Sequence, residues 1–133
     1  MQIRKAKPKD AKGSFKVIQS DDLNHLSEKA FVNASKNKLI IYFVAEHKKE
    51  IIGFILGFYS PLGKKAFISE VRVLKNFRSK KIGTKLVSHF CRFVFNNKVT
   101  RVYNFIERRL IPFYCGSCKF KKVNNWIEVV KKK

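Results

Sequence analysis

A short basic segment between two differently patterned stretches carries the side chains with the clearest chemistry. It reads Arg78-Ser79-Lys80-Lys81-Ile82-Gly83-Thr84. A helix that begins here would point unpaired backbone N–H groups, and the positive end of its dipole, toward the space that the Arg and Lys side chains share. That arrangement suits a phosphate or pyrophosphate. A basic loop that only caps an ordinary helix has the same composition, so the segment alone leaves both interpretations open.

The stretches on either side of this segment predict the elements that must position it. Alternation of apolar and charged residues over Phe67–Leu74 predicts a half-buried strand. Its apolar face is expected to hold Phe67, Val71 and Val73, and its charged face Glu70 and Arg72. Past Gly83 the apolar residues recur at helical spacing, which predicts an amphipathic helix. Its apolar face comprises Ile82, Leu86, Val87, Phe90, Phe93 and Val94.

The rest of the sequence predicts a first strand before Pro8, a helix after it, and then a second helix, a hairpin and two late strands. Ser20-Asp21-Asp22 is typical of an N-cap cluster for the second helix. Leu39–Glu46 and Ile51–Tyr59 are nearly continuous apolar runs joined by a short basic turn, which predicts a hairpin covered on both faces. The late strands are expected at Val99–Ile106 and Val123–Val130. The expected order β-α-α-β-β-β-α-β-α-β spans residues 1–133 as one domain.

Composition places the chain among globular proteins with a strong positive charge. Of its 133 residues, 45% are hydrophobic and 13 are Phe, which is enough for a sizeable core. Thirty Lys and Arg residues against nine Asp and Glu give a formal charge of +21. Such a field attracts phosphates, nucleic acid, ribosomes or acidic proteins, and it repels polyamines. A coding bias toward lysine would give the same charge, so charge alone names no partner.

The sequence also indicates where in the cell the protein is expected. No apolar run approaches the roughly 20 residues that span a bilayer. The N-terminal residues Met1-Gln2-Ile3-Arg4-Lys5 are not followed by an apolar stretch like that of a signal peptide. We therefore expect a cytoplasmic protein without a membrane partner.

The three cysteines form an odd set. Cys115 and Cys118 are spaced as C-x-x-C and could join Cys91 and His89 in a zinc site, but no second C-x-x-C supports that interpretation. A thioredoxin-like role needs the pair at the start of a helix that follows the first strand, which is not its place here. We expect unpaired thiols and no metal.

The basic segment and the strand before it carry a family resemblance. The sequence VRVLKNFRSKKIGTKL resembles the acetyl-CoA-binding motif of the GNAT N-acetyltransferases, in which V-x-V is followed by (Q/R)-x-x-G-x-(G/A). The matching residues are Val71, Val73, Arg78 and Gly83. Lys81 stands where the family usually has its first glycine. A β-carbon in a left-handed conformation costs about 1–2 kcal/mol, so we expect Lys81 to keep ordinary helical angles.

A second stretch is similar to another signature of the same family. Leu110-Ile111-Pro112-Phe113-Tyr114 resembles A-x-x-F-Y-x-x-x-G-F, whose tyrosine reaches the thioester sulfur, and Tyr114 occupies the matching position. Glu107 stands where an Asn is common, and Cys118 or Lys119 replaces the glycine before Phe120. These departures concern the local loop geometry. The order of predicted elements over the whole chain also matches the family.

The resemblance implies an α/β fold of the GNAT type, with three α/β/α layers around a central mixed, mostly antiparallel sheet. It implies transfer of an acetyl group from acetyl-CoA to an amine. Backbone groups of the strand would hold the pantetheine, and those of the turn would hold the pyrophosphate. The implied cofactor-binding residues are Val71, Arg72, Val73, Arg78, Ser79, Lys80, Lys81, Ile82, Gly83 and Thr84.

Glu70 and Tyr114 are the expected catalytic residues. An ammonium has no lone pair, so a base must take its proton before attack, and the departing thiolate profits from an acid. Glu70 on the charged strand face is the candidate base, acting directly or through water, and Tyr114 is the candidate acid. Each has a structural alternative: Glu70 would simply pair with Arg72 or a lysine, and Tyr114 would be a core aromatic whose hydroxyl is satisfied.

Two functions from different classes fit these features. The first is an active N-acetyltransferase whose acceptor is a protein N-terminus or lysine, a small amine or an aminoacyl group. The positive charge favours an acceptor attached to something anionic, such as a ribosome or tRNA. The second is a basic module of the same fold that binds nucleic acid or a ribosome with weak or no catalysis. The sequence predicts neither the acceptor nor the oligomeric state.

Overall fold

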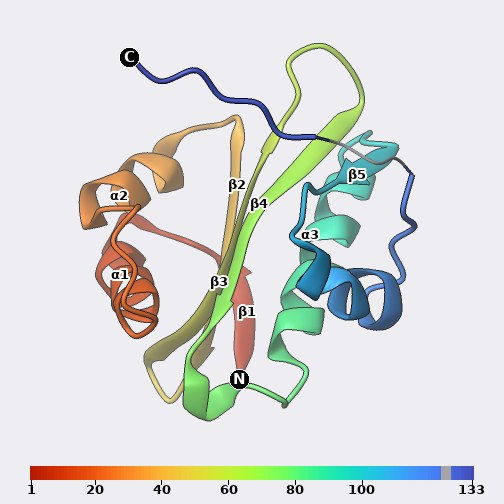
Figure 1. Cartoon of the computed structure of the whole chain (residues 1–133). Coiled ribbons are helices and arrows are strands. Elements are labelled where there is room, and N and C mark those ends of the chain that lie inside the picture. The colour runs from red at the N-terminus through yellow and green to blue at the C-terminus, as the bar shows by residue number, and fades with distance from the viewer. Residues whose placement is uncertain (124–126) are drawn as a thin grey trace.

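The computed structural model describes residues 1–123 and 127–133. It contains a five-stranded sheet whose strands follow one another in space in the order of the sequence (Figure 1). The strands are β1 (Gln2–Lys5), β2 (Ile40–His47), β3 (Glu50–Tyr59), β4 (Lys65–Val73) and β5 (Arg101–Tyr103). Neighbours from β1 to β4 are antiparallel, and β5 runs parallel to β4. This confirms the expected mixed, mostly antiparallel sheet.

Helices cover both faces of the sheet and create three layers (Figure 1). α1 (Ala11–Gln19) and α2 (Glu28–Lys36) lie on one face. α3 (Ile82–Asn96) lies on the other face, together with a π-helical turn at Pro112–Ser117. The α/β/α architecture is therefore confirmed. No helix in the described residues is both long and apolar enough to cross a membrane.

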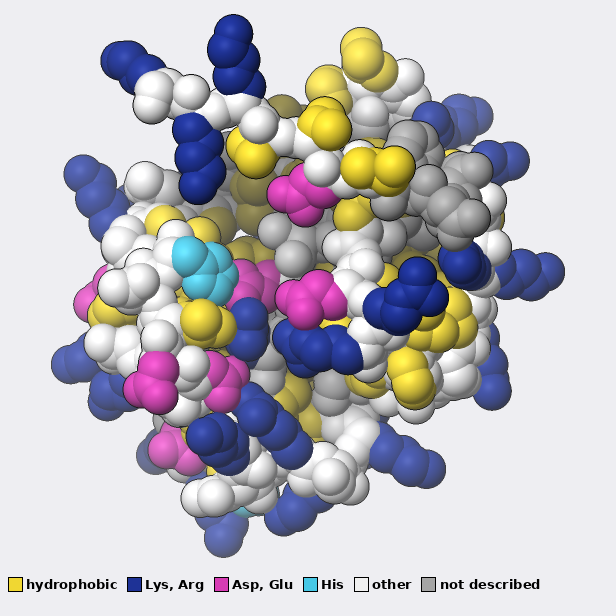
Figure 2. Space-filling view, in the orientation of Figure 1, with side chains coloured by type: hydrophobic (Ala, Val, Ile, Leu, Met, Phe, Trp, Pro, Cys, Tyr) yellow, Lys and Arg dark blue, Asp and Glu magenta, His cyan; other side chains and the backbone are white. Residues whose placement is uncertain are grey.

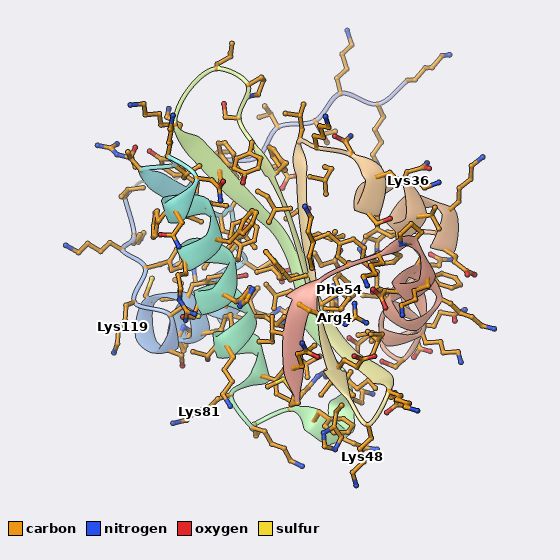
Figure 3. The ribbon with its side chains drawn as sticks, turned by 180° about the vertical axis from the view of Figure 1, so that it is seen from behind. Arg4, Lys36, Lys48, Phe54, Lys81 and Lys119 are labelled. Atoms are coloured by element: carbon orange, nitrogen blue, oxygen red, sulfur yellow. The ribbon has the colours of Figure 1, made fainter. Side chains whose placement is uncertain are left out.

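The central strands β2 and β3 are apolar along most of their length because both of their faces are covered. On the α1 and α2 side, the ring of Phe54 meets the ring of Phe31 edge-on, with centroids 5.1 Å apart. On the α3 side, Ile55 packs in one buried cluster with Leu86 and Phe90. Figure 3 shows Phe54 near the middle of the sheet. The predicted hairpin is thus confirmed with its two covered faces.

The pairing of β3 with β4 contains a β-bulge. Gly57 pairs with Ile68, but the next pair is Leu56 with Glu70, so Ser69 is an extra residue in β4. Gly57 beside the bulge allows α3 to approach closely, since a Cβ at this position would lie 2.5 Å from a phenylalanine ring of that helix. The bulge therefore sits where the sheet and α3 are in tight contact.

The bulge overturns one expectation about β4. Simple alternation predicts Phe67, Val71 and Val73 on the same face. Phe67 instead pairs and stacks with Phe58 on the α1 and α2 side, with centroids 5.2 Å apart. Val71 and Val73 pack into the core beneath α3. The extra residue moves every side chain that follows it to the opposite face.

The expected N-cap cluster at Ser20-Asp21-Asp22 is also wrong. α2 is capped further along the chain by Ser27, whose side-chain oxygen accepts a hydrogen bond from the Ala30 backbone N–H at 3.1 Å. Ser20 instead lies at the end of α1, where its hydroxyl donates to the Val17 carbonyl at 2.6 Å. Asp21 turns toward β4, where two arginines bind its carboxylate. Asp21 therefore forms ion pairs with distant arginines and does not cap a helix.

The late strands differ from expectation. β5 is confined to Arg101–Tyr103 within the predicted Val99–Ile106. The predicted strand Val123–Val130 includes residues 124–126, which lie outside the described residues, and the described positions 123 and 127–130 form no strand. Ile127 and Val129 are 86% and 87% exposed. Apolar alternation produces a strand only where a neighbouring strand pairs with it.

Asp10 is a buried charge that joins β1 to the start of α1. Its two oxygens accept hydrogen bonds from the Arg4 guanidinium at 2.8 and 2.9 Å, and one of them accepts from the Lys7 backbone N–H at 2.8 Å. Burial works against the charged carboxylate, but these hydrogen bonds outweigh it and lower the pKa of Asp10. The charged pair therefore stabilises the folded state.

We predict that Phe54→Ala lowers the free energy of unfolding by about 3–5 kcal/mol, because the ring is fully buried and its removal leaves a cavity. Urea denaturation followed by circular dichroism measures the loss. Phe95→Ala is the matched control, because Phe95 on α3 is 50% exposed. Its effect should stay within about 0.5 kcal/mol. Equal losses in the two variants would contradict the proposed core.

A second prediction concerns pH. Because the pKa of Asp10 is lower in the folded than in the unfolded chain, its contribution is complete above the ordinary Asp pKa of about 3.9 and is lost as the pH falls below it. Asp10→Asn should lower the thermal midpoint near neutral pH and flatten its decline in acid. Asp22→Asn, an exposed change, serves as control. Parallel pH curves for the parent and Asp10→Asn would show that this carboxylate does not act as described.

Candidate active site

The two parallel strands of the sheet separate soon after they begin to pair. Three pairs join β4 to β5, the last of them Phe67 with Tyr103. β4 then continues to Val73, while β5 ends. In the described part of the chain, no strand pairs with this side of β4 beyond Phe67. The separation leaves an open strand edge beside α3 (Figure 1).

The peptide groups of Val71 and Val73 face this open edge. The Leu74 N–H donates to the Ile52 carbonyl of β3 at 2.8 Å. The N–H and C=O groups of successive residues point toward opposite edges of a strand. Those of Val73 and Val71 therefore point away from β3. In agreement, the Val73 carbonyl accepts a hydrogen bond from the Arg78 side chain at 2.9 Å. An extended ligand could therefore bond to this edge as an added strand.

Two left-handed residues shape the basic loop between β4 and α3. Ser79 has a φ of 65° and Lys81 a φ of 63°. Lys81 is the N-cap of α3 and lies at the end of that helix (Figure 3). The expectation that Lys81 keeps helical angles is wrong, because it adopts the conformation that a glycine favours. The turn into α3 imposes this conformation in spite of a cost of about 1–2 kcal/mol.

The first turn of α3 presents free backbone N–H groups to this loop. The Lys85 N–H donates to the Lys81 carbonyl at 3.0 Å and closes the first turn. The N–H groups of Ile82, Gly83 and Thr84 therefore have no acceptor within the helix. They lie beside the basic loop, at the positive end of the helix dipole. The structure thus provides the geometry of an anion site at the place the sequence indicates.

Side chains of the same segment fix its position against the rest of the protein. Ile82 is buried, and Thr84 forms a hydrogen bond with Cys118. A Cβ at Gly83 would lie 3.3 Å from the Phe113 ring, so this glycine allows a close approach. The C-terminal turn therefore packs directly against the start of α3.

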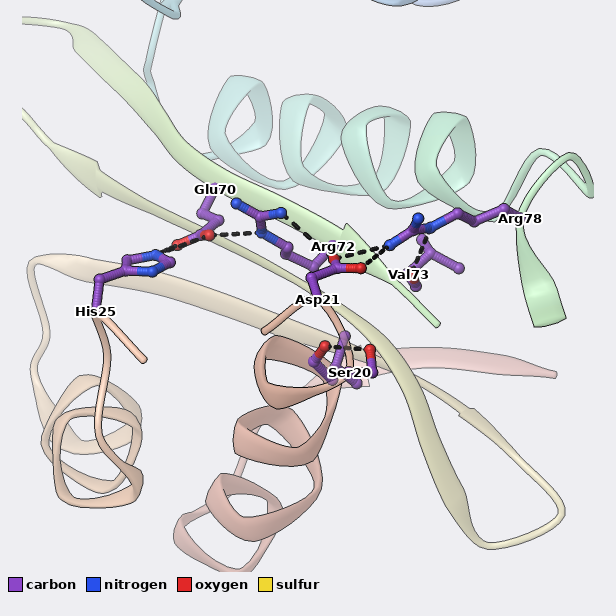
Figure 4. Close-up of polar contacts among 8 residues, drawn as sticks. Ser20, Asp21, His25, Glu70, Arg72, Val73 and Arg78 are labelled. Atoms are coloured by element: carbon purple, nitrogen blue, oxygen red, sulfur yellow. Dashed lines mark hydrogen bonds and ion pairs between the residues drawn. The ribbon is translucent and has the colours of Figure 1, made fainter. Parts of the chain in front are cut away.

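A chain of charged side chains runs across the α1 and α2 side of β4 (Figure 4). Both oxygens of Asp21 accept hydrogen bonds from Arg78, at 2.7 and 2.8 Å. The same carboxylate lies 3.4 Å from the Arg72 guanidinium. Burial opposes the charge, but the Arg78 and Arg72 contacts outweigh it and lower the pKa of Asp21. Asp21 thus links the end of α1 to both β4 and the basic loop.

Glu70 continues this chain. One of its oxygens accepts a hydrogen bond from Arg72 Nε at 2.7 Å. The His25 Nε2 lies 3.0 and 2.9 Å from its two oxygens. The Glu70 side chain is only 12% exposed, whereas His25 is 47% exposed. Glu70 is therefore paired with Arg72, as its structural alternative requires, and it also reaches a histidine that is open to solvent.

Tyr114 is buried in the π-helical turn on the α3 side of the sheet. Its ring meets the Phe120 ring edge-on, with centroids 5.5 Å apart. Burial raises the pKa of Tyr114 to about 12, although a hydrogen bond with the Asn104 side chain lowers it. The hydroxyl is therefore protonated at neutral pH. Asn104 directly follows β5, so this hydroxyl lies where β5 departs from β4.

The two predicted catalytic residues lie on opposite faces of the sheet. Glu70 is on the α1 and α2 side, and Tyr114 belongs to the buried cluster on the α3 side. No hydrogen bond joins them in the described residues. The open edge of β4 lies between the two faces, so a group held in the gap could meet one residue from each side.

The face shown in Figure 2 carries charge of both signs, unevenly distributed. Lys and Arg side chains project around its whole outline. The fewer acidic side chains lie toward the middle and toward α1 and α2. The basic rim agrees with the formal charge of +21. It surrounds the site with a field that attracts anions.

The cysteines are unpaired, and no group of three or more metal-binding side chains occurs among the described residues. Cys91 and Cys118 pack at the edge of the cluster that holds Tyr114. Burial raises the pKa of each thiol to about 11, so both are protonated at neutral pH.

Sequence reasoning missed three residues of the site: Asp21, His25 and Asn104. Asp21 was assigned to a helix cap, and neither His25 nor Asn104 belongs to a motif. One signal was present for Asp21, because acidic residues are rare in this chain and a carboxylate among so many basic residues is expected to pair with one of them. No feature of the sequence near His25 or Asn104 indicates that these residues belong to the site.

Comparisons with known proteins agree with this fold. A sequence profile of the acetyltransferase (GNAT) family matches residues 9–117. A comparison with curated proteins finds no matching sequence. Many solved structures share the fold. A putative acetyltransferase from Agrobacterium tumefaciens superimposes with a TM-score of 0.85 at 19% identity, over 98% of this chain and 100% of that one.

Two further structures are similar. Glucosamine-6-phosphate N-acetyltransferase from Arabidopsis thaliana gives a TM-score of 0.78 at 19% identity, over 98% of this chain and 97% of that one. PaiA N-acetyltransferase from Thermoplasma acidophilum, in complex with coenzyme A, gives 0.70 at 17% identity, over 81% and 80%. At such identities the likeness shows a shared fold, whereas the family profile covers most of the sequence. The chain therefore belongs to the GNAT family of acetyltransferases.

Proposed function

We propose that the protein transfers the acetyl group of acetyl-CoA to the nitrogen of an amine. The observation that carries the proposal is the open edge of β4, which leads directly to the free N–H groups at the start of α3. One extended ligand with a diphosphate at one end fits both features. The coenzyme A complex of the related T. acidophilum enzyme supports this choice of ligand.

Each part of the site would hold a different part of acetyl-CoA. The backbone of Val71 and the N–H of Val73 would bond to the amides of the pantetheine arm. The N–H groups from Ser79 to Thr84 would bind the pyrophosphate, assisted by the Lys80 and Lys81 ammonium groups. Arg78 and Arg72 now bind Asp21, so they would contribute to the positive field, and Arg78 could turn to a phosphate.

The proposed transfer needs only acetyl-CoA, the amine, Glu70 and Tyr114. The neutral amine attacks the thioester carbonyl carbon, a C–N bond forms, and the C–S bond breaks to release CoA as a thiol. Glu70 would take the proton that the ammonium must lose, directly or through water. The contact with His25 gives that carboxylate a partner that reaches solvent. Tyr114, protonated at neutral pH, would supply a proton to the departing sulfur, and the proton that the attacking nitrogen loses as the amide forms would restore the hydroxyl.

A second candidate is a basic module that binds nucleic acid or a ribosome without catalysis. The charge of +21 supports it, and the same charge supports an acceptor carried by an anionic assembly. Salt-sensitive RNA binding without any stabilisation by acetyl-CoA would favour this candidate over the enzyme. The left-handed backbone at Lys81 weakens it, because the missing glycine was its main support from the sequence.

Substitutions at position 81 test the cofactor loop. We predict that Lys81→Gly binds acetyl-CoA within about threefold of the parent, because glycine adopts the same backbone conformation and only one exposed charge is lost. Lys81→Pro should weaken binding at least about tenfold, a difference of about 1.4 kcal/mol, because proline cannot adopt a positive φ. Calorimetry at low ionic strength, with CoA as competitor, measures both affinities.

Circular dichroism and the thermal midpoint check that both position-81 variants are folded. Equal affinities for the glycine and proline variants would refute the role of this backbone. Absence of any binding of acetyl-CoA by the parent protein would refute the proposed function itself.

Substitutions of Glu70 and Tyr114 test the chemistry. Glu70→Gln and Tyr114→Phe should each lower the rate of amine-dependent CoA thiol release by about 10²–10⁴-fold. Acetyl-CoA affinity should stay within about threefold, because neither side chain contacts the phosphate loop. Glu50→Gln, at an exposed position, and Tyr59→Phe, at a half-buried position of β3, make the same changes elsewhere and are the matched controls. Unchanged rates in the Glu70 or Tyr114 variant would remove that residue from the mechanism.

A further inference from the structure

An apolar pocket lies on the acceptor side of Glu70. It has a volume of about 190 Å³ and is formed between α2 and the sheet. Its lining includes Leu26, Ala30, Phe31, Leu56, Phe58 and Ser69. None of the described residues that line it is charged.

Three residues that line the pocket are neighbours of Glu70 or His25, which places the pocket beside the Glu70 carboxylate. Leu56 lines the pocket and is the cross-strand partner of Glu70. Ser69 lines the pocket and precedes Glu70 in β4. Leu26 lines the pocket and follows His25, whose ring contacts both Glu70 oxygens. The pair Glu70 and His25 therefore stands at the edge of an otherwise apolar cavity.

The size of the cavity limits what it can hold. Apolar cavities of about 150 Å³ in protein cores accept a benzene molecule. This pocket is slightly larger, so it has room for one phenylalanine, leucine or methionine side chain. The ring of Phe58 forms one wall, and Phe67 stacks on it with a centroid distance of 5.2 Å. A bulky apolar group would therefore bury its surface against aromatic and aliphatic side chains.

The charges around the pocket limit the acceptor further. Glu70 offers one carboxylate, which suits a single ammonium group. The chain has only nine acidic residues against thirty basic ones. A polyamine or an aminoglycoside needs several carboxylates to replace the water around its cations, and no carboxylate is among the described residues that line this pocket. The acceptor that fits is a monoamine.

We infer that the acceptor is an amine adjacent to one bulky apolar group, such as the α-amine of a peptide whose first residue is phenylalanine, leucine or methionine. The apolar group occupies the pocket, and the amine lies at its edge near Glu70. This inference rests on the proposed function and names the substrate class of that site. A protein N-terminus is one of the acceptors that the sequence leaves open, and the pocket selects among N-termini.

The test uses the intact protein and four short peptides that differ only in the first residue: phenylalanine, leucine, serine or lysine. Release of CoA thiol from acetyl-CoA gives kcat/KM for each peptide, with spermidine as a further acceptor. The phenylalanine and leucine peptides should exceed the serine peptide by about tenfold or more, because each apolar group in a fitted pocket discriminates by about 10–200-fold. Spermidine should be a poor acceptor.

Two substitutions on α2 separate the pocket from general effects. Ala30→Phe fills the pocket and should lower kcat/KM for the phenylalanine peptide at least about tenfold while the serine peptide changes little. Asn33→Phe adds the same side chain at an exposed position of the same helix and should leave both rates unchanged. Calorimetry with acetyl-CoA shows that the cofactor site of each variant is intact.

The outcomes distinguish the inference from the proposed function. If acetyl-CoA binds but apolar peptides react no faster than the serine peptide, the substrate assignment is wrong and the proposed function stands. The same holds if spermidine or the lysine peptide is preferred, or if Ala30→Phe and Asn33→Phe behave alike. If acetyl-CoA does not bind to the parent protein, both fail together.

Discussion

The early separation of β4 from β5 is the constraint on which the site depends. A strand edge with unpaired peptide groups is a liability, because it can pair with another chain. Here the open part of the edge is short, because β4 ends at Val73, so it offers few peptide groups to another chain. The same unpaired groups lead to the free N–H groups of α3. A ligand that bonds to both completes hydrogen bonds that the protein leaves unmade.

The bulge at Ser69 determines which side chains of β4 lie on each face of the sheet beside this edge. Without the extra residue, the pairing would continue as Leu56 with Ser69 and Ile55 with Glu70. Glu70 would then point into the core beneath α3, where an unpaired charge is costly. With the bulge, Glu70 reaches the α1 and α2 side, while the valines that follow complete the core. One inserted residue therefore places the charged side chains of β4 on one face and its valines on the other.

The elements with long, regular patterns could be predicted from the sequence, because local periodicity and burial agree there. The β2–β3 hairpin and α3 are examples, and the basic loop lies between β4 and α3 as its sequence indicates. The phase change at Ser69 was missed because Phe67, an apolar residue on the opposite face, conceals the shift of the inward residues from Ala66 and Ile68 to Val71 and Val73. Asp21 was missed because its partners lie more than fifty residues away. Lys81 was misjudged because the tertiary turn overrides the local preference.

The charged side chains connect the two halves of the site. Asp21 binds Arg78 of the basic loop and Arg72 of β4, and Arg72 in turn binds Glu70. Because one carboxylate holds both arginines, a phosphate that attracts Arg78 competes directly with Asp21. The ion pair between Asp21 and Arg72 then depends on what occupies the loop. Because Arg72 also binds Glu70, the position of Glu70 depends on it as well. The basic loop and Glu70 therefore share one set of charges on the α1 and α2 side of β4.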